Sequence, residues 1–102
     1  MEKIHRIIKG EEVYELADFM SMFADSSRLK ILAELLTAPL CVNHICKRTG
    51  MTQSAVSHQL ATLRRADIVR ADRSGKNVVY SIADEHIGMI LSTAVAHIEE
   101  KV

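Results

Sequence analysis

Near Ile68 of this 102-residue chain, the spacing of apolar residues changes from that of a helix to that of a strand, and this change constrains the fold more than any other feature. Before it, apolar side chains recur at helical spacing. After it, residues 68–73 and 78–82 have the composition of strands and flank a turn at 74–77, which predicts a β-hairpin. We therefore expect a hairpin and a last helix that begins near Asp84, preceded by helices over residues 11–23, 27–36, 42–48 and 52–67.

Residues that begin and end helices stand at the boundaries of these segments. The run Asp25-Ser26-Ser27 offers N-cap side chains for one helix, and Thr52 offers one for another. Ala38-Pro39 and Gly50 are typical of helix ends. The order of elements predicts a mainly α chain with a small β-hairpin, a winged helix-turn-helix that forms a single domain over residues 1–102.

Composition excludes several classes of protein. The apolar stretches are too short to span a membrane, and the first ten residues lack the apolar core of a signal peptide. Two cysteines do not make a disulfide framework, so we expect reduced thiols and a cytoplasmic location. No nucleophile–base pair or phosphate-binding loop is present, so we expect neither an enzyme nor a small organic substrate.

The net charge of zero conceals three segments of different sign. Residues 1–40 carry five Lys and Arg against seven Asp and Glu, a balance of −2. Residues 41–80 carry seven against two, a balance of +5, and residues 81–102 carry one against four, a balance of −3. A basic middle between acidic ends favours a face that binds a polyanion, although a solvated charged surface would look the same.

The predicted helix over residues 52–67 has the character of a DNA-recognition helix. Val56, Leu60 and Leu63 form one apolar stripe, and short polar side chains stand between them. Gln53 can form paired hydrogen bonds with adenine, and the hairpin cations suit phosphate or minor-groove contacts. The candidate DNA-binding residues are Thr52, Gln53, Ser54, Ser57, His58, Arg64, Arg65, Arg73 and Lys76, with Arg70 beside them on the hairpin.

These segments resemble the ArsR/SmtB family of metal-responsive bacterial repressors. Residues 23–32 are similar to the family's opening core segment, residues 51–64 to its recognition helix with the frequent Ser-His-x-Leu step, and residues 68–82 to its wing. The resemblance covers nearly the whole chain. It implies a homodimer that binds double-stranded operator DNA containing an inverted repeat and releases it when an inducer binds.

The last predicted helix carries candidate metal ligands at both ends: Asp84 and His86, then His97 and Glu100. His86 and His97 lie within about 20° around the helix but about 16 Å apart along its axis, so one ion cannot bind both within one chain. Antiparallel pairing with the same helix of a second chain would bring the two ends together and create two sites per dimer. The apolar contact between the paired helices would come from Ile87, Ile90, Leu91, Ala94 and Ile98.

The same spacing is similar to the family's C-terminal-helix site, D-x-H-x10-H-x2-(E/H). Two imidazoles and two carboxylates suit Zn(II), and Co(II) or Ni(II) are alternatives that affinity order alone does not exclude. Each residue also has a simpler interpretation: Asp84 can be an N-cap, and the histidines and Glu100 can be surface residues.

Other functions remain open. Cys41, His44 and Cys46 align with the segment where other branches of the family carry a thiolate sensor, but Asn43 stands where the second cysteine of that sensor belongs. A thiol-binding metal or redox signal at Cys41, or another inducer, is therefore an alternative. A winged-helix dimer that serves only as a protein-interaction module is the alternative from a different class.

Overall fold

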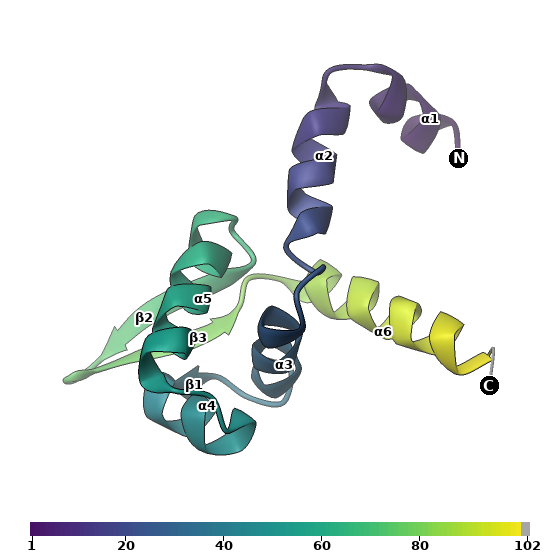
Figure 1. Ribbon diagram of the computed structural model, residues 1–102. Coiled ribbons are helices and arrows are strands. Elements are labelled where there is room, and N and C mark those ends of the chain that lie inside the picture. Colours follow the sequence, from purple (N-terminus) through teal and green to yellow (C-terminus); the bar gives the residue numbers. More distant parts are fainter. Residues whose placement is uncertain (101–102) are drawn as a thin grey trace.

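The structure, a computed structural model, describes residues 1–100 (Figure 1). Its helices and strands follow in the order α1 (Glu2–Lys9), α2 (Glu12–Ser21), α3 (Ser26–Leu35), β1 (Leu40–Cys41), α4 (Val42–Thr49), α5 (Gln53–Arg65), β2 (Val69–Ser74), β3 (Asn77–Ile82) and α6 (Glu85–Glu100). The predicted winged helix-turn-helix is confirmed, with α4 and α5 as the helix-turn-helix and β2–β3 as the wing. The predictions of a last helix running to the C-terminus and of one domain over 1–102 include residues 101–102, which lie outside the described part.

Local signals explain most of the helix boundaries. Asp25 caps α3, because its carboxylate accepts a hydrogen bond from the Arg28 N–H at 2.9 Å. Gly50 ends α4 with φ +77°, a left-handed conformation that glycine adopts at little cost. At the end of α5, Asp67 has φ +59°, and the N–H groups of Asp67 and Ile68 donate to the carbonyls of Arg64 and Leu63. This Schellman arrangement turns the chain directly from α5 into β2.

The sheet contains one strand more than the predicted hairpin. Its order is β1–β3–β2, with both pairs antiparallel. Ser74 pairs with Asn77 across a two-residue loop that begins at Gly75, whose φ of +63° suits a type II′ turn. The two-residue strand β1 pairs Leu40 with Tyr80 and was not predicted, because two residues are too few to show an alternating pattern.

The buried core belongs to the central part of the chain. It is entirely aliphatic and comprises Ile31, Leu32, Leu35, Leu40, Ile45, Val56, Leu60, Leu63, Ile68, Val69 and Ile87. Neither α1 nor α2 contributes a buried residue, and α6 contributes only Ile87 in its first turn. The body is therefore built from α3, α4, α5 and the sheet.

The terminal helices project from this body. Figure 1 shows α2 rising from it with α1 at the tip, while α6 extends away and the hairpin points to the opposite side. The radius of gyration is 15.1 Å, against about 13 Å for a compact chain of this length. Helix α1 was not predicted, although Ile4, Ile7 and Ile8 have helical spacing. No helix within residues 1–100 is both long and apolar enough to cross a membrane.

Candidate functional site

Helix α5 divides its side chains as the sequence predicted. Val56, Leu60 and Leu63 are fully buried against the body. Thr52 caps the helix, because its hydroxyl accepts a hydrogen bond from the Ala55 N–H at 3.2 Å. The other polar candidates of the first two turns, Gln53, Ser54, Ser57 and His58, are exposed. A row of short hydrogen-bonding groups at the exposed N-terminal part of a helix suits contact with base edges.

Gln59 differs from the exposed polar candidates of α5. Its side chain is half-buried between α5 and α3, where its Oε1 accepts a hydrogen bond from Arg28 Nη1 at 3.2 Å and its Nε2 donates to Asp25 Oδ2 at 3.4 Å. The contacts of Gln59 with Arg28 and Asp25 were not predicted from the sequence. The signal available in the sequence was weak: Gln59 lies about 60° around the helix from Val56, at the border of the apolar stripe.

The wing places its predicted cations in the solvent. Arg70, Arg73 and Lys76 are exposed, with Arg70 and Arg73 on β2 and Lys76 in the turn. Lys76 also lines a shallow hollow of about 270 Å³ together with Gln53 of α5, between the hairpin and the helix-turn-helix. One wing cation and one candidate base-contacting side chain therefore share a surface.

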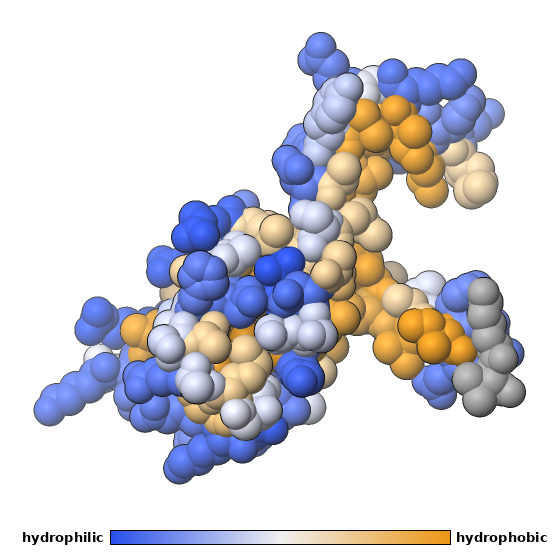
Figure 2. Space-filling model, viewed as in Figure 1, coloured by the Kyte–Doolittle hydropathy of each residue, from blue (hydrophilic) through white to orange (hydrophobic). Residues whose placement is uncertain are grey.

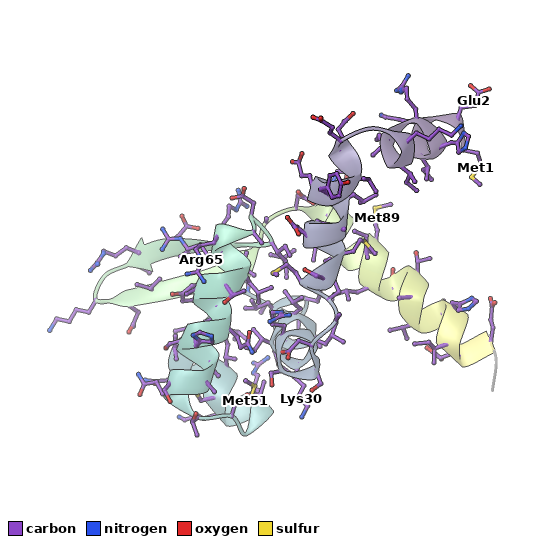
Figure 3. All side chains as sticks on the ribbon, turned by 45° about the horizontal axis from the view of Figure 1, so that its top comes forward. Met1, Glu2, Lys30, Met51, Arg65 and Met89 are labelled. Carbon is purple, nitrogen blue, oxygen red and sulfur yellow. The ribbon has the colours of Figure 1, made fainter. Side chains whose placement is uncertain are left out.

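Arg64 and Arg65 lie at the other end of α5. Both are exposed, and they line a second hollow with Asp67 and Tyr80. Figure 3 shows Arg65 and Met51 at opposite ends of α5. If the N-terminus of α5 enters a DNA groove, Arg64 and Arg65 at its other end lie away from the bases. Their position therefore favours contact with phosphates.

The four candidate metal ligands form one pair at the start of α6 and another at its end. Asp84 Oδ1 lies 3.1 Å from His86 Nδ1 and also accepts a hydrogen bond from the His86 N–H at 2.8 Å. Asp84 is thus an N-cap and a partner of the imidazole through the same oxygen. His97 and Glu100 are exposed near the other end. Within residues 1–100 of this single chain, no group of three His, Cys, Asp or Glu side chains is arranged to hold a metal ion.

The terminal helices carry apolar side chains in solvent. Met89, Val95 and Ile98 of α6 are 60%, 52% and 64% exposed, and Ile4, Ile8, Tyr14 and Met20 of α1 and α2 are exposed too. Figure 2 shows hydrophobic atoms gathered on these two projections, away from the polar surface of the body. Such large apolar side chains on the two projections, one formed by α1 and α2 and the other by α6, indicate a surface that another molecule covers.

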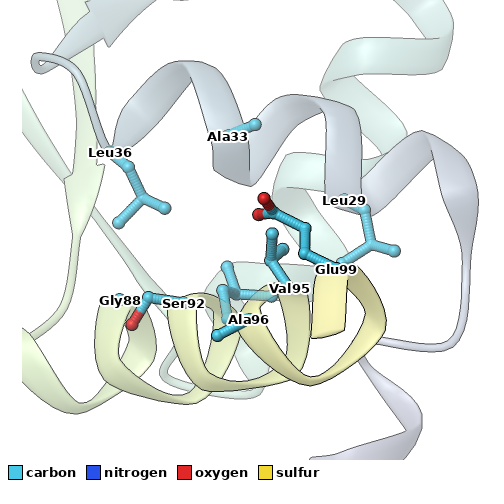
Figure 4. A pocket seen from close by; sticks show the side chains of 9 residues that line it. Leu29, Ala33, Leu36, Gly88, Ser92, Val95, Ala96 and Glu99 are labelled. Carbon is cyan, nitrogen blue, oxygen red and sulfur yellow. The ribbon is translucent and has the colours of Figure 1, made fainter. Parts of the chain in front are cut away.

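A groove of about 550 Å³ runs between α3 and α6 (Figure 4). Leu36 and Gly88 lie at one end, and Leu29 and Glu99 lie at the other. A Cβ atom on Gly88 would lie only 3.2 Å from Leu36 Cδ2, so the small residue lets the start of α6 approach α3.

The prediction that Ile87 lies in the contact between the paired last helices is wrong. Ile87 was expected to contact the partner's last helix, but it is 3% exposed and packs in the core of its own chain. The first turn of α6 anchors the helix to the body, so the faces left for a partner begin further along, at Met89 and beyond.

Within residues 1–100, the thiol-bearing segment with Cys41, His44 and Cys46 does not form a second metal site. Cys41 ends β1 and precedes α4, Cys46 packs partly against the core, and His44 is exposed on α4. Both cysteines are free and half-buried.

Comparisons with known proteins agree with this geometry. The sequence model of the bacterial regulatory proteins of the arsR family matches residues 25–71, from the cap of α3 into β2. The HTH-type transcriptional regulator NmtR of Mycobacterium tuberculosis is 42% identical over 92 residues, which cover 90% of this chain and 77% of that protein.

Two solved structures extend the likeness to the whole fold. A homodimeric winged helix-turn-helix DNA-binding domain from Mycobacterium bovis has a TM-score of 0.78 at 28% identity, covering 91% of this chain and 90% of that one. The antimony-specific transcriptional repressor AntR has a TM-score of 0.82 at 33% identity, covering 93% of this chain and 86% of that one.

Proposed function

The chain belongs to the ArsR family of bacterial transcriptional regulators, and on that premise we propose that it is a metal-responsive repressor. As a homodimer it binds an inverted repeat in operator DNA. It releases the DNA when a metal ion, Zn(II) in the first place, binds sites formed between the last helices of the two subunits. The observation that carries the metal part of this proposal is the contact between Asp84 and His86 at the start of α6, together with the exposed His97 and Glu100, three residues apart, near its end.

DNA binding is supported by the exposed polar face of α5 and the exposed cations around it. Gln53, Ser54, Ser57 and His58 are available to base edges, and Thr52 begins the helix beside them. Arg64 and Arg65 at the far end, with Arg73 and Lys76 on the wing, suit the phosphates on either side. All nine residues come from α5 with its N-cap and from the β2–β3 hairpin that follows it, an arrangement that suits a recognition helix in the major groove with a wing beside it.

Dimerisation is supported by the exposed apolar faces of the terminal helices. Within residues 1–100, Leu91 of α6 and Phe19 of α2 pack partly against the core, but most of the apolar side chains of α6 beyond its first turn and of α1 and α2 are left exposed. The groove between α3 and α6 lies in the same region. A twofold partner would cover these surfaces with their own counterparts and would supply the core area that a chain of this size lacks.

The side chains fit a divalent metal with nitrogen and oxygen ligands. Each end of α6 supplies one imidazole and one carboxylate, and all four side chains are exposed and open to a partner. Asp84 already holds the His86 ring in one orientation. The metal would supply a cross-link between subunits, and two imidazoles with two carboxylates complete a four-coordinate set for zinc. Cobalt and nickel use the same donor types, so the choice among them is an outcome of the test.

The link to DNA follows from where α6 is anchored. Ile87 fixes its first turn in the same core that holds α5, so the position of one α6 relative to its partner sets the distance between the two recognition helices. Binding to an inverted repeat requires half-sites about one turn of DNA apart. A dimer held at another distance loses this match. The coupling is reciprocal, so operator DNA must weaken metal binding by the same factor.

The test uses an inverted-repeat duplex that the wild-type protein enriches from a randomised DNA pool. Zinc, cobalt and nickel are titrated into the protein–DNA complex, and the metal affinity is measured with and without the duplex. We expect at least one metal to release the DNA, and equal metal affinities in the two states would refute the coupling. Failure to enrich any duplex would favour the protein-interaction module instead.

A single substitution tests the assignment of the metal ligands on α6. His97→Ala is expected to bind the duplex with wild-type affinity and to stop responding to the metal. His44→Ala, which removes an exposed histidine from the alternative thiol-bearing segment, should respond normally, and loss of its metal response would favour that segment instead. A His97→Ala protein with the wild-type metal response would show that the ligands lie elsewhere.

A further inference from the structure

Arg28 connects the projecting arm to the recognition helix through a set of polar contacts. It lies in the first turn of α3 and is half-buried. Its Nε donates to the carbonyl of Met22 at 2.9 Å and its Nη2 to the carbonyl of Ser21 at 3.3 Å, both at the end of α2. Its Nη1 donates to Gln59 Oε1 at 3.2 Å, in the middle of α5. The side chain of Arg28 thus joins the start of α3 to the end of α2 and to the middle of α5.

Asp25 completes the set and fixes the direction of the Gln59 amide. Its Oδ2 accepts from the Arg28 N–H at 2.9 Å and from Gln59 Nε2 at 3.4 Å. The amide oxygen of Gln59 therefore faces a cation while its nitrogen faces a carboxylate. Hydrogen bonds to charged groups are stronger than neutral ones, and the planar fork of arginine holds several acceptors in fixed directions.

This set matters because α2 has few other attachments to the body. It has no buried residue, and Phe19, with Met22 and Phe23 just beyond its end, packs only partly against the core. The carbonyls at the end of a helix carry partial negative charge, which a guanidinium complements. Arg28 therefore supplies the directional contact that orients the arm, where apolar packing alone would allow it to swing.

We infer that Arg28, acting through Gln59, is a positioning residue that sets the orientation of α5 relative to the α1–α2 arm, and thereby the distance between the two recognition helices of a dimer. The inference rests on the proposed function, because the arm lies in the proposed dimer interface. Neither side chain needs to touch DNA. Their effect is on the half-site spacing that the dimer accepts.

The experiment measures the affinity of dimers for a series of duplexes. The series contains the enriched inverted repeat, the same repeat with one base pair added or removed between its half-sites, and a duplex with one half-site. Each added base pair rotates one half-site by about 34° relative to the other. Wild-type protein is expected to prefer one spacing.

Two variants test opposite ends of the contact set. Arg28→Met removes the fork, and Gln59→Met removes the α5 end while leaving the bonds of Arg28 to α2 in place. Each is expected to lower the preference for the correct spacing by about tenfold, the effect of losing one hydrogen bond to a charged group, with single half-site affinity unchanged. The double variant should lose no more than either alone, because both substitutions break the same connection. Lys30→Met, which removes an exposed cation from the same helix, is the control and should behave as wild type.

Arg28→Lys is a conservative variant that is expected to fold. It separates the effect of the positive charge from the effect of the guanidinium geometry. It keeps the positive charge but not the fork, so its spacing preference should fall nearly as far as that of Arg28→Met. Unchanged spacing preference in folded dimeric variants would overturn the inference, as would additive effects of the two substitutions. An equal loss on full and single half-sites would also overturn it, since that indicates a general structural role. Wild-type protein that binds no inverted repeat would instead overturn the proposed function, and this inference with it.

Discussion

Neutralising the wing should change the salt dependence of DNA binding by an amount that the structure allows us to calculate. Arg73 and Lys76 are both exposed at the outer part of the β2–β3 hairpin, and within the described residues neither is held in an ion pair. They are therefore free to contact phosphates. The variant is Arg73→Gln combined with Lys76→Gln, which removes the charges without shortening the side chains greatly.

The magnitude follows from counterion release. A dimer presents two copies of each wing, so the variant loses four phosphate contacts if both side chains make one. The slope of log affinity against log salt should then become shallower by about 3.6, at about 0.9 per phosphate. When salt is raised from about 50 to 200 mM, the affinity of the wing variant should therefore fall by a factor about a hundredfold smaller than that of the wild type.

Fluorescence anisotropy on the enriched duplex at several salt concentrations measures both slopes. Lys3→Gln combined with Lys9→Gln is the matched control, because it removes the same charge from α1, which lies on the opposite side of the body from the hairpin (Figure 1). The control slope should match the wild type once sedimentation shows that the control is still a dimer. A wing variant with the wild-type slope would refute phosphate contact by the hairpin.

Substitutions at three further positions test the fold and the interface. Thr52→Ala removes the cap of α5 and should lower the free energy of unfolding by about 1 kcal/mol, measured by urea denaturation; no change would show that the 3.2 Å cap bond contributes nothing. Asp67→Val places a β-branched residue at φ +59° and should lower the same free energy by about 1–2 kcal/mol, whereas Asp67→Gly should not lower it; equal effects would exclude backbone strain as the cause. Ile98→Glu puts a charge on an apolar face that is 64% exposed in one chain, so sedimentation should show a shift from dimer to monomer, and an unshifted dimer would place the interface elsewhere.

The sequence predicted the elements that carry strong local signals. Thr52 and Gly50 marked the two sides of the helix-turn-helix turn, and the change of period at Ile68 marked the wing. These signals are local, because a cap or a left-handed glycine acts within one turn of the chain. The polar face of α5 followed from helical periodicity alone. On this face Gln53, Ser54, Ser57 and His58 are exposed, and none of the four caps α5.

What could not be predicted depends on contacts between distant segments. Ile87 has the spacing of an interface residue, but whether an apolar side chain packs on its own body or on a partner depends on the direction of α6. The contacts of Arg28 with Gln59 join residues 31 positions apart, and nothing in either residue's neighbourhood indicates the other. Strand β1 exists because β3 has a free edge beside Leu40, which is a property of the assembled sheet.

Mixed dimers show whether each metal site is shared between two chains. One chain carries His86→Asn and the other His97→Asn, with different affinity tags so that the mixed dimer can be isolated. In either pure dimer both sites lack an imidazole, so neither should bind cobalt or zinc with wild-type affinity. In the mixed dimer, one site loses both imidazoles and the other regains its full set, so the account predicts one tightly bound ion per dimer. A mixed dimer that binds no ion tightly would contradict it.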